Sequence, residues 1–305
     1  MDDLDHIGLE RSDVIVTSPR AWQTVSSRFP KDVRLLDADG LAVHGASRIV
    51  AVGAGRTMDR AKILAADSGL PLITIPTVLA TDAAFSSVAA FRDRGFVEYR
   101  ETGLPEAVVI DSKVLAQAPL AWHRWGLGDL ISVVSALSDR RTITGVDPYV
   151  EEAAAVLVGD TLKWAGEATD DLVALADLLV RKVELGLAVD AAWLEEGTEH
   201  YLAYLLETKI NKSLWHGELI LALMPVCAAV QQWPASQVAT VSDALRACGA
   251  VRPARCLLTS AAFVDMVNSM PEYCREHGYD NTVLRDDRVL DEIRTEAIRA
   301  WETGW

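Results

Sequence analysis

Residues 47–62 read SRIVAVGAGRTMDRAK, a run rich in β-branched residues that ends at two glycines and passes directly into a segment with helical spacing. A strand, a tight turn and a helix in this order form the unit from which parallel α/β sheets are built. Glycines at such a turn let the backbone approach a phosphate group, and the N–H groups of the helix start attract its negative charge. The stretch therefore predicts an α/β domain with a phosphate-binding turn at Gly53, Ala54 and Gly55. Because the pattern is not GxGxxG, an ordinary tight turn explains it equally well.

Further short runs of β-branched residues alternate with helical patterns over the first third of the chain, at residues 14–17, 34–36, 72–75 and 107–110. This alternation predicts a Rossmann-like parallel sheet covered by helices, and the polar segment at 92–102 is typical of a hairpin. Beyond about residue 115 the strand pattern ends and only helical spacing remains. We expect an α/β nucleotide-binding domain at residues 1–114, an all-helical domain at residues 115–305, and a cleft between them.

The composition restricts the class of protein. The chain has 305 residues, 50% of them hydrophobic and 24% charged, which is typical of a globular enzyme. Its net charge of −15 argues against a surface for nucleic acid or anionic membranes, because these are bound by clustered lysines and arginines. No apolar run approaches the ~20 residues of a membrane helix, and the acidic first residues do not resemble a signal peptide. We expect a cytoplasmic protein whose four scattered cysteines are reduced and buried.

Residues 196–218 contain two histidines, His200 and His216, each beside acidic residues and glycines rather than in an apolar stripe. Imidazoles in such surroundings often bind metal ions, and the two rings can face one cleft from two helices separated by a turn rich in Lys, Asn and Ser. Asp129 follows two glycines at the start of the helical region and can supply a third, harder ligand. The simpler interpretation is that Asp129 caps the helix that follows it.

The loop after the strand at 72–75 places hydroxyl groups and a carboxylate, among them Thr77, Thr81 and Asp82, at the carboxyl end of the predicted sheet. Open α/β sheets bind their ligands at this edge. An ordinary loop in which Asp82 acts as a cap is the competing interpretation. The functional interpretation of Asp82 is strengthened if the glycine turn also binds a ligand.

In order and spacing, these segments resemble the dehydroquinate synthase-like superfamily, which includes metal-containing alcohol dehydrogenases, glycerol dehydrogenase and sn-glycerol-1-phosphate dehydrogenase. The matching segments are residues 52–59 with Lys62, 75–82, 109–111, 116–119, 126–129, 199–200 and 216–218. The resemblance implies metal ligands at Asp129, His200 and His216. It implies cofactor-binding positions at Gly53, Ala54, Gly55, Arg56, Thr77 and Thr81, with Asp82 as the catalytic residue. An aspartate at the first ligand position is the pattern of the dehydrogenase branches, whereas the cyclases carry glutamate there.

Several positions depart from the pattern of this superfamily. Arg56 replaces the serine of the family's glycine turn, and the α/β domain is shortened at its N-terminus. Ser18 and Arg20 follow the first strand, where relatives that prefer NAD tend to have an acidic residue. An arginine there can accept a 2′-phosphate, so the cofactor is NAD or NADP. Thr81 and Tyr204 stand where glycerol-1-phosphate dehydrogenases often have histidine, which argues against glycerol phosphate as the substrate.

The resemblance implies an NAD(P)-dependent dehydrogenase that oxidises a secondary alcohol, with one divalent metal ion, zinc or iron, acting as a Lewis acid on the substrate hydroxyl. One alternative is a dehydrogenase of natural-product biosynthesis that oxidises and decarboxylates a C-terminal threonine of a ribosomal peptide. Another is a non-catalytic protein with a degraded cofactor turn. The expected partner is a small-molecule alcohol or a peptide, without nucleic acid or membrane, and the sequence leaves open whether the chain forms a homo-oligomer.

Overall fold

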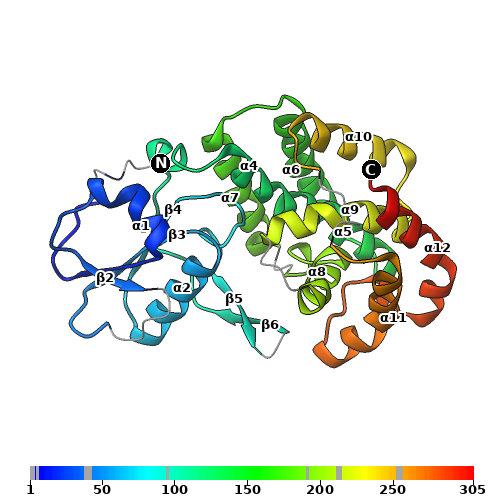
Figure 1. Cartoon of the computed structure of the whole chain (residues 1–305), viewed down its shortest axis with the longest axis horizontal. Helices are drawn as coiled ribbons and strands as arrows, with labels where there is room; N and C mark the ends of the chain where they lie inside the picture. The colour runs from blue at the N-terminus through cyan, green and yellow to red at the C-terminus, as the bar shows by residue number, and fades with distance from the viewer. Residues whose placement is uncertain are drawn as a thin grey trace. The chain divides into compact units, whose positions relative to one another are not determined.

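The computed structural model describes residues 4, 7–37, 43–93, 96–189, 192–210, 215–251 and 257–305. The chain divides into two compact units, one made of residues 1–126 and 171–183 and the other of residues 127–170 and 184–305 (Figure 1). The boundary expected from the sequence lies at residues 114 and 115. The short helices α3 (Ser112–Leu115) and α4 (Leu120–His123), together with the 3-10 turn η3 (Arg124–Gly126), are grouped with the first unit.

The first unit contains a five-stranded parallel sheet, as the strand–turn–helix pattern predicts. The strands run in the order β2-β1-β3-β4-β7, and adjacent β1 and β3 are in register from Asp13 opposite Arg48 to Thr17 opposite Val52. The segment predicted as a hairpin forms a separate antiparallel pair, β5 and β6. The elements are β1 (Asp13–Thr17), α1 (Pro19–Val25), η2 (Ser26–Arg28), β2 (Arg34–Asp37), β3 (Arg48–Gly53), α2 (Arg56–Ser68), β4 (Leu72–Pro76), β5 (Val88–Asp93), β6 (Phe96–Glu101) and β7 (Ala107–Val108).

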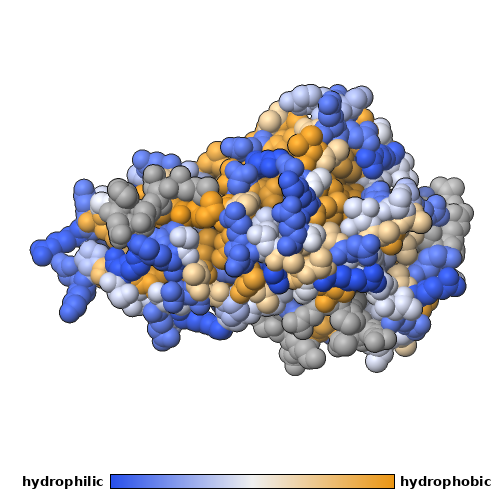
Figure 2. Space-filling view, turned by 90° about the horizontal axis from the view of Figure 1, so that it is seen from above, coloured by the Kyte–Doolittle hydropathy of each residue, from blue (hydrophilic) through white to orange (hydrophobic). Residues whose placement is uncertain are grey.

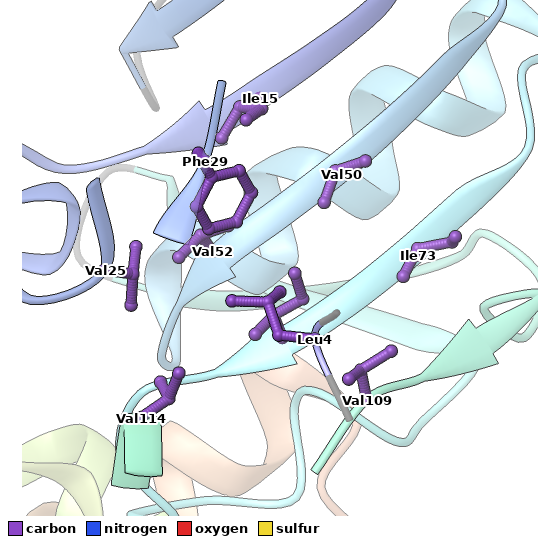
Figure 3. Close-up of a cluster of buried hydrophobic side chains, with 10 residues drawn as sticks. Leu4, Ile15, Val25, Phe29, Val50, Val52, Ile73, Val109 and Val114 are labelled. Atoms are coloured by element: carbon purple, nitrogen blue, oxygen red, sulfur yellow. The ribbon is translucent and has the colours of Figure 1, made fainter. Parts of the chain in front are cut away.

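The core of the first unit lies on one face of this sheet. Alternate strand residues, among them Ile15 and Val50, pack against Val25 and Phe29 from the region of α1, and Leu4 joins the same cluster (Figure 3). Side chains on a strand alternate between the two faces of a sheet, so the intervening residues face the other side, where α2 packs against β3 and β4. Each fully buried aliphatic or aromatic side chain stabilises the fold by about 1.5–3 kcal/mol.

The second unit is helical, as the loss of the strand pattern predicts. Helix α9 contacts α5, α8 and α12, and residues 219–228 of this helix are buried on every side. A helix that is apolar all round is typical of the interior of a domain. The helices of the second unit are α5 (Leu127–Ile143), α6 (Pro148–Gly166), η4 (Ala192–Leu194), α8 (Thr198–Lys209), α9 (His216–Val230), α10 (Ala235–Ala247), α11 (Ser260–His277), η6 (Val283–Arg285) and α12 (Asp287–Thr303). Helix α7 (Leu172–Ala188) belongs to the first unit up to residue 183.

The helical spacing that the sequence shows beyond residue 115 is interrupted in the structure between η4 and α8. The 3-10 turn η4 ends at Leu194, and α8 begins only after Gly197. Gly197 is extended and buried, and a Cβ there would lie 2.7 Å from Asp139 Oδ2 and 3.0 Å from Ala136 Cα. This close packing against α5 holds the residue outside the helical conformation. Of the turn predicted between the two histidines, residues 211–214 lie outside the described part.

The surface view in Figure 2 shows apolar residues interspersed among polar and charged ones on one face of the molecule. Within the described residues, none of the helices combines the length and the apolar content needed to span a bilayer.

His123, for which the sequence suggests no partner, is fully buried and bonded on both ring nitrogens. Leu79 N–H donates to Nδ1 at 3.1 Å, so Nε2 carries the proton and donates to the Leu115 carbonyl at 3.0 Å. Burial lowers the pKa of the imidazole. His123 thereby joins the loop after β4 to α3 in the uncharged form.

We expect His123 to make the stability of the protein depend on pH. As pH falls below about 6.5, the unfolded chain binds a proton that the folded imidazole excludes, and the free energy of unfolding decreases by up to about 1.4 kcal/mol per pH unit. His123→Gln keeps one acceptor and one donor without this titration, so its decrease should be smaller. Urea unfolding between pH 7.5 and 5.5 measures the difference. The exposed His44, changed to Gln, is the control, and equal pH profiles for wild type and His123→Gln would contradict the assignment.

Candidate metal centre and cofactor turn

Asp129, His200 and His216, which are far apart in the sequence, come together in the second unit. Each offers one ligand atom, and these three atoms all lie within 4.8 Å of one another. Asp129 and His200 are buried, whereas His216 is partly exposed. His216 Nε2 lies 4.0 Å from Asp129 Oδ1, and the centroids of the two imidazole rings are 4.9 Å apart. The three residues proposed from the sequence therefore lie close together in the structure.

Three helices carry these side chains, and the first turns of α5 and α9 approach most closely at two glycines. A Cβ on Gly128 would lie 2.7 Å from both the Cα and the carbonyl oxygen of Gly217, closer than real Cβ atoms come. Gly128 precedes Asp129, and Gly217 follows His216. The two glycines therefore let the helix backbones touch where two of the three site residues project. Asp129 lies inside the first turn of α5, so the interpretation of Asp129 as a cap before the helix is wrong.

His200 and its surroundings are more constrained than the sequence shows. Its Nδ1 lies 2.8 Å from Glu199 Oε1, and Glu199 is completely buried. The Tyr204 ring lies 6.0 Å from that of His216 with an interplanar angle of 19°, and the Tyr204 hydroxyl donates to Glu196 Oε1 at 2.6 Å. Glu199 therefore restrains the His200 ring through a hydrogen bond, and Tyr204 packs beside the His216 ring.

The donor set fits a divalent transition-metal ion. Bonds of about 2.0–2.2 Å to one ion place tetrahedral ligand atoms roughly 3.5 Å apart. The 4.0 Å between His216 and Asp129 therefore requires only a small inward movement. Two imidazoles and one carboxylate suit zinc and iron alike and leave coordination positions for substrate.

In the first unit, the residues predicted to bind the cofactor meet at the carboxyl edge of the sheet. β3 ends at Gly53, and Gly55, with φ of +41°, precedes α2, which begins at Arg56. Thr77 N–H donates to the Gly53 carbonyl at 2.7 Å, so the loop after β4 starts beside the turn. The first turn of a helix presents N–H groups that the helix itself does not use, as an anion site needs.

Ser18 and Arg20 lie at the same edge, because β1 is parallel to β3 and ends beside it. The Ser18 side chain accepts from Ala21 N–H and caps α1. The exposed Arg20 guanidinium lies 4.4 Å from the centroid of the Trp122 ring, a cation–π arrangement. Trp122 thereby orients the arginine next to the glycine turn.

Thr81 and Asp82, the other residues predicted in the loop after β4, form different contacts. Thr81 Oγ1 accepts from Ala83 N–H at 3.3 Å within its own loop. Asp82 forms an ion pair with Lys182 on α7, with Oδ2 2.6 Å from Nζ, and the lysine side chain is only 4% exposed. Asp82 is therefore a paired carboxylate rather than a helix cap. Lys182 could not be identified from the sequence, because it lies 100 positions from Asp82 in a helix without a recognisable motif.

Asp59 and Lys62 on α2 reinforce this loop. Lys62 is fully buried and donates to Ser86 Oγ at 3.1 Å and to the Val88 carbonyl. Burial raises the pKa of Asp59 to about 6, while the charge of Lys62 acts in the opposite direction. The helix that begins at the glycine turn therefore also anchors the end of the loop that carries Asp82.

Comparisons with known proteins show which sequences and folds this chain resembles. The sequence profile of a family described as iron-containing alcohol dehydrogenase matches residues 12–119. The glycerol-1-phosphate dehydrogenase (NAD(P)+) of Methanococcoides burtonii is 27% identical over 211 residues, which cover 65% of this chain and 59% of that protein. The enzyme of the same name from Thermococcus kodakarensis is 30% identical over 184 residues, which cover 57% of this chain and 52% of that protein. The matched part thus spans little more than half of the length of these relatives.

Solved structures extend the likeness to nearly the whole chain. A probable glycerol dehydrogenase from Sinorhizobium meliloti 1021 has a TM-score of 0.73 at 18% identity, covering 95% of this chain and 90% of that chain. The glycerol dehydrogenase of Schizosaccharomyces pombe has a TM-score of 0.72 at 19% identity, with coverages of 96% and 86%. The chain thus resembles iron-containing alcohol dehydrogenases in sequence over residues 12–119, and it shares the fold of glycerol dehydrogenases over nearly its whole length.

We expect the contact of the two glycines to be necessary for the packing of α5 against α9 at the candidate metal centre. Gly128→Ala forces α5 and α9 apart and should lower the free energy of unfolding by roughly 1–3 kcal/mol. Gly159→Ala on α6, where an added Cβ meets nothing within 4 Å, should instead raise it by about 0.5–1 kcal/mol. Urea unfolding of the two variants tests this, and a Gly128→Ala protein as stable as wild type would contradict it.

Proposed function

We propose that this protein is an NAD(P)-dependent, metal-containing dehydrogenase that oxidises a secondary alcohol or reduces the corresponding ketone. The observation that carries the proposal is the convergence of Asp129, His200 and His216 in the second unit. The strand, glycine turn and helix of the first unit, and the likeness to dehydrogenases, support it. A nicotinamide cofactor held at the glycine turn would supply a hydride acceptor for the carbinol carbon in oxidation, or a hydride donor in reduction.

Asp129, His200 and His216 hold a zinc or iron ion in this proposal. A divalent ion bound there supplies Lewis-acid chemistry to an alcohol or carbonyl oxygen. The burial of Asp129 and His200 limits the access of water to two of the three donors. Tyr204, packed beside both imidazoles, restricts the orientations of the rings.

The cofactor is NAD or NADP, with its pyrophosphate at Gly53, Ala54, Gly55 and the start of α2. Gly55 takes a positive φ that other residues adopt only with strain, which suits a turn that lets the backbone approach phosphate. Arg56 is exposed at the first position of α2 and can contact the same phosphates. Thr77 and Thr81 face the nicotinamide side in this arrangement, and Arg20 is the residue that can accept a 2′-phosphate.

Asp82 and Lys182 act as a fixed ion pair on the side of the nicotinamide and the substrate. The lysine charge faces the carboxylate, so Asp82 serves as a hydrogen-bond acceptor that orients a donor group of the substrate or of the nicotinamide amide. The curated relatives are named for glycerol 1-phosphate. Because Thr81 and Tyr204 depart from the histidines often present in those enzymes, we propose a different secondary alcohol as the substrate.

We expect the metal ligands to be indispensable for both metal content and turnover. Protein purified without chelators should contain about one zinc or iron ion per chain and oxidise members of a panel of secondary alcohols with NAD+ or NADP+. Asp129→Ala and His216→Ala should reduce metal content and turnover at least about 100-fold, because each removes a ligand rather than a supporting group. Elemental analysis and NAD(P)H absorbance are the measurements.

Asp243→Ala on α10 is the matched control, since its side chain is 76% exposed. Alcohol oxidation by metal-free wild type, or full activity in Asp129→Ala, would contradict the proposal. Tryptophan-to-nicotinamide energy transfer with NADH and NADPH reports cofactor binding separately. Failure to bind either nucleotide would favour a non-catalytic protein.

A further inference from the structure

Two buried carboxylates lie against the beginning of α8, the helix that carries His200. Asp139 and Glu199 are both completely buried. Glu199 Oε1 accepts from Gly197 N–H at 3.0 Å and lies 2.8 Å from His200 Nδ1. Burial of a carboxylate is costly unless it is hydrogen-bonded, so these contacts are strong constraints on the local structure.

The bond between Glu199 and His200 determines which ring nitrogen can face a metal ion. A carboxylate only accepts hydrogen bonds, so Nδ1 of His200 must carry the proton. In a neutral imidazole the remaining nitrogen, Nε2, then holds the lone pair that a metal ligand requires. Glu199 therefore sets the tautomer of His200 and the rotation of its ring at the same time.

Asp139 fixes the helix turn on which this pair stands. It accepts hydrogen bonds from Thr198 N–H at 2.8 Å, from Thr198 Oγ1 at 2.9 Å and from Val283 N–H at 3.0 Å. Asp139 and the ligand Asp129 belong to the same helix, α5. One helix thus supplies a ligand and also anchors the start of the helix that carries another ligand.

Gly197 makes this arrangement possible. A Cβ at this position would lie 2.7 Å from Asp139 Oδ2 and 3.0 Å from Glu199 Oε2, so only glycine lets both carboxylates approach the same piece of backbone. Gly197, Glu199 and His200 therefore lie within one turn at the start of α8, and Asp139 contacts this turn from α5.

We propose that Glu199 is a positioning residue for the metal ion: it holds His200 as the Nδ1–H tautomer with Nε2 directed to the metal, on a helix turn anchored by Asp139. This inference rests on the proposed metal site. Outer residues that hold a ligating histidine in this way typically change metal affinity 10–100-fold when they are removed. The competing account is that Glu199 only stabilises the start of α8 through Gly197 N–H.

Glu199→Gln separates these two roles. The glutamine keeps the size of the side chain and an acceptor for Gly197 N–H, but it loses the negative charge that strengthens the bond to the imidazole. Competition with a chromophoric chelator gives the affinity for Zn2+, and the visible spectrum of the Co2+ form reports the geometry of the ligands. We expect Glu199→Gln to bind Zn2+ about 10–100-fold more weakly with an altered Co2+ spectrum, at an unchanged melting temperature of the metal-free protein.

Glu207→Gln, the same change two turns further along α8, is the matched control and should bind Zn2+ within about twofold of wild type. Wild-type affinity and spectrum in Glu199→Gln would overturn the inference while leaving the metal site intact. A wild-type protein that binds no metal would overturn both proposals.

A measurement on the wild-type protein covers the case in which the variant does not fold. In the metal-free protein labelled with 15N-histidine, the ring-nitrogen shifts of His200, assigned by comparison with His200→Gln, distinguish the two tautomers. The Nδ1–H form is the expected result. The Nε2–H form would overturn the inference.

Discussion

The candidate metal centre depends on the contact between the first turns of α5 and α9, where Gly128 and Gly217 bring two helix backbones together. The close approach of the two helices also determines where two site residues lie, because Asp129 and His216 are next to the two glycines in the sequence. A side chain at either glycine would have to displace a helix backbone, which interiors packed as densely as crystals resist. The third site residue, His200, comes from α8, which is anchored to α5 through Asp139.

The helices of the second unit therefore pack around the polar side chains of the candidate site. Residues 219–228 of α9 are buried on every side, and the first turn of this helix supplies His216. Burial raises the pKa of Asp139 to about 7, and the charge of Glu199 adds to this effect. Three hydrogen bonds from Thr198 and Val283 act in the opposite direction and compensate in part for placing a carboxylate in the interior. Such a network holds one arrangement strongly when all of its members are bonded.

Much of the first unit could be predicted from the sequence, because β-branched runs and the turn at Gly53–Gly55 are local signals. The parallel sheet and the hairpin are confirmed. The three candidate ligands were suggested by their residue types and surroundings, and the resemblance to a superfamily implied the same set. Spacing alone cannot show that residues 129, 200 and 216 are neighbours. The partners of His123, the ion pair of Asp82 with Lys182 and the bond from His200 to Glu199 could not be predicted. Each depends on the packing of segments that carry no shared motif.

X-ray absorption spectroscopy of the metal-loaded protein shows whether Asp129, His200 and His216 together bind one metal ion. We expect a first shell of nitrogen and oxygen atoms at about 2.0–2.2 Å, with the outer-shell scattering of two imidazole rings. A sulfur shell, or a shell of oxygen atoms without imidazole scattering, would contradict it.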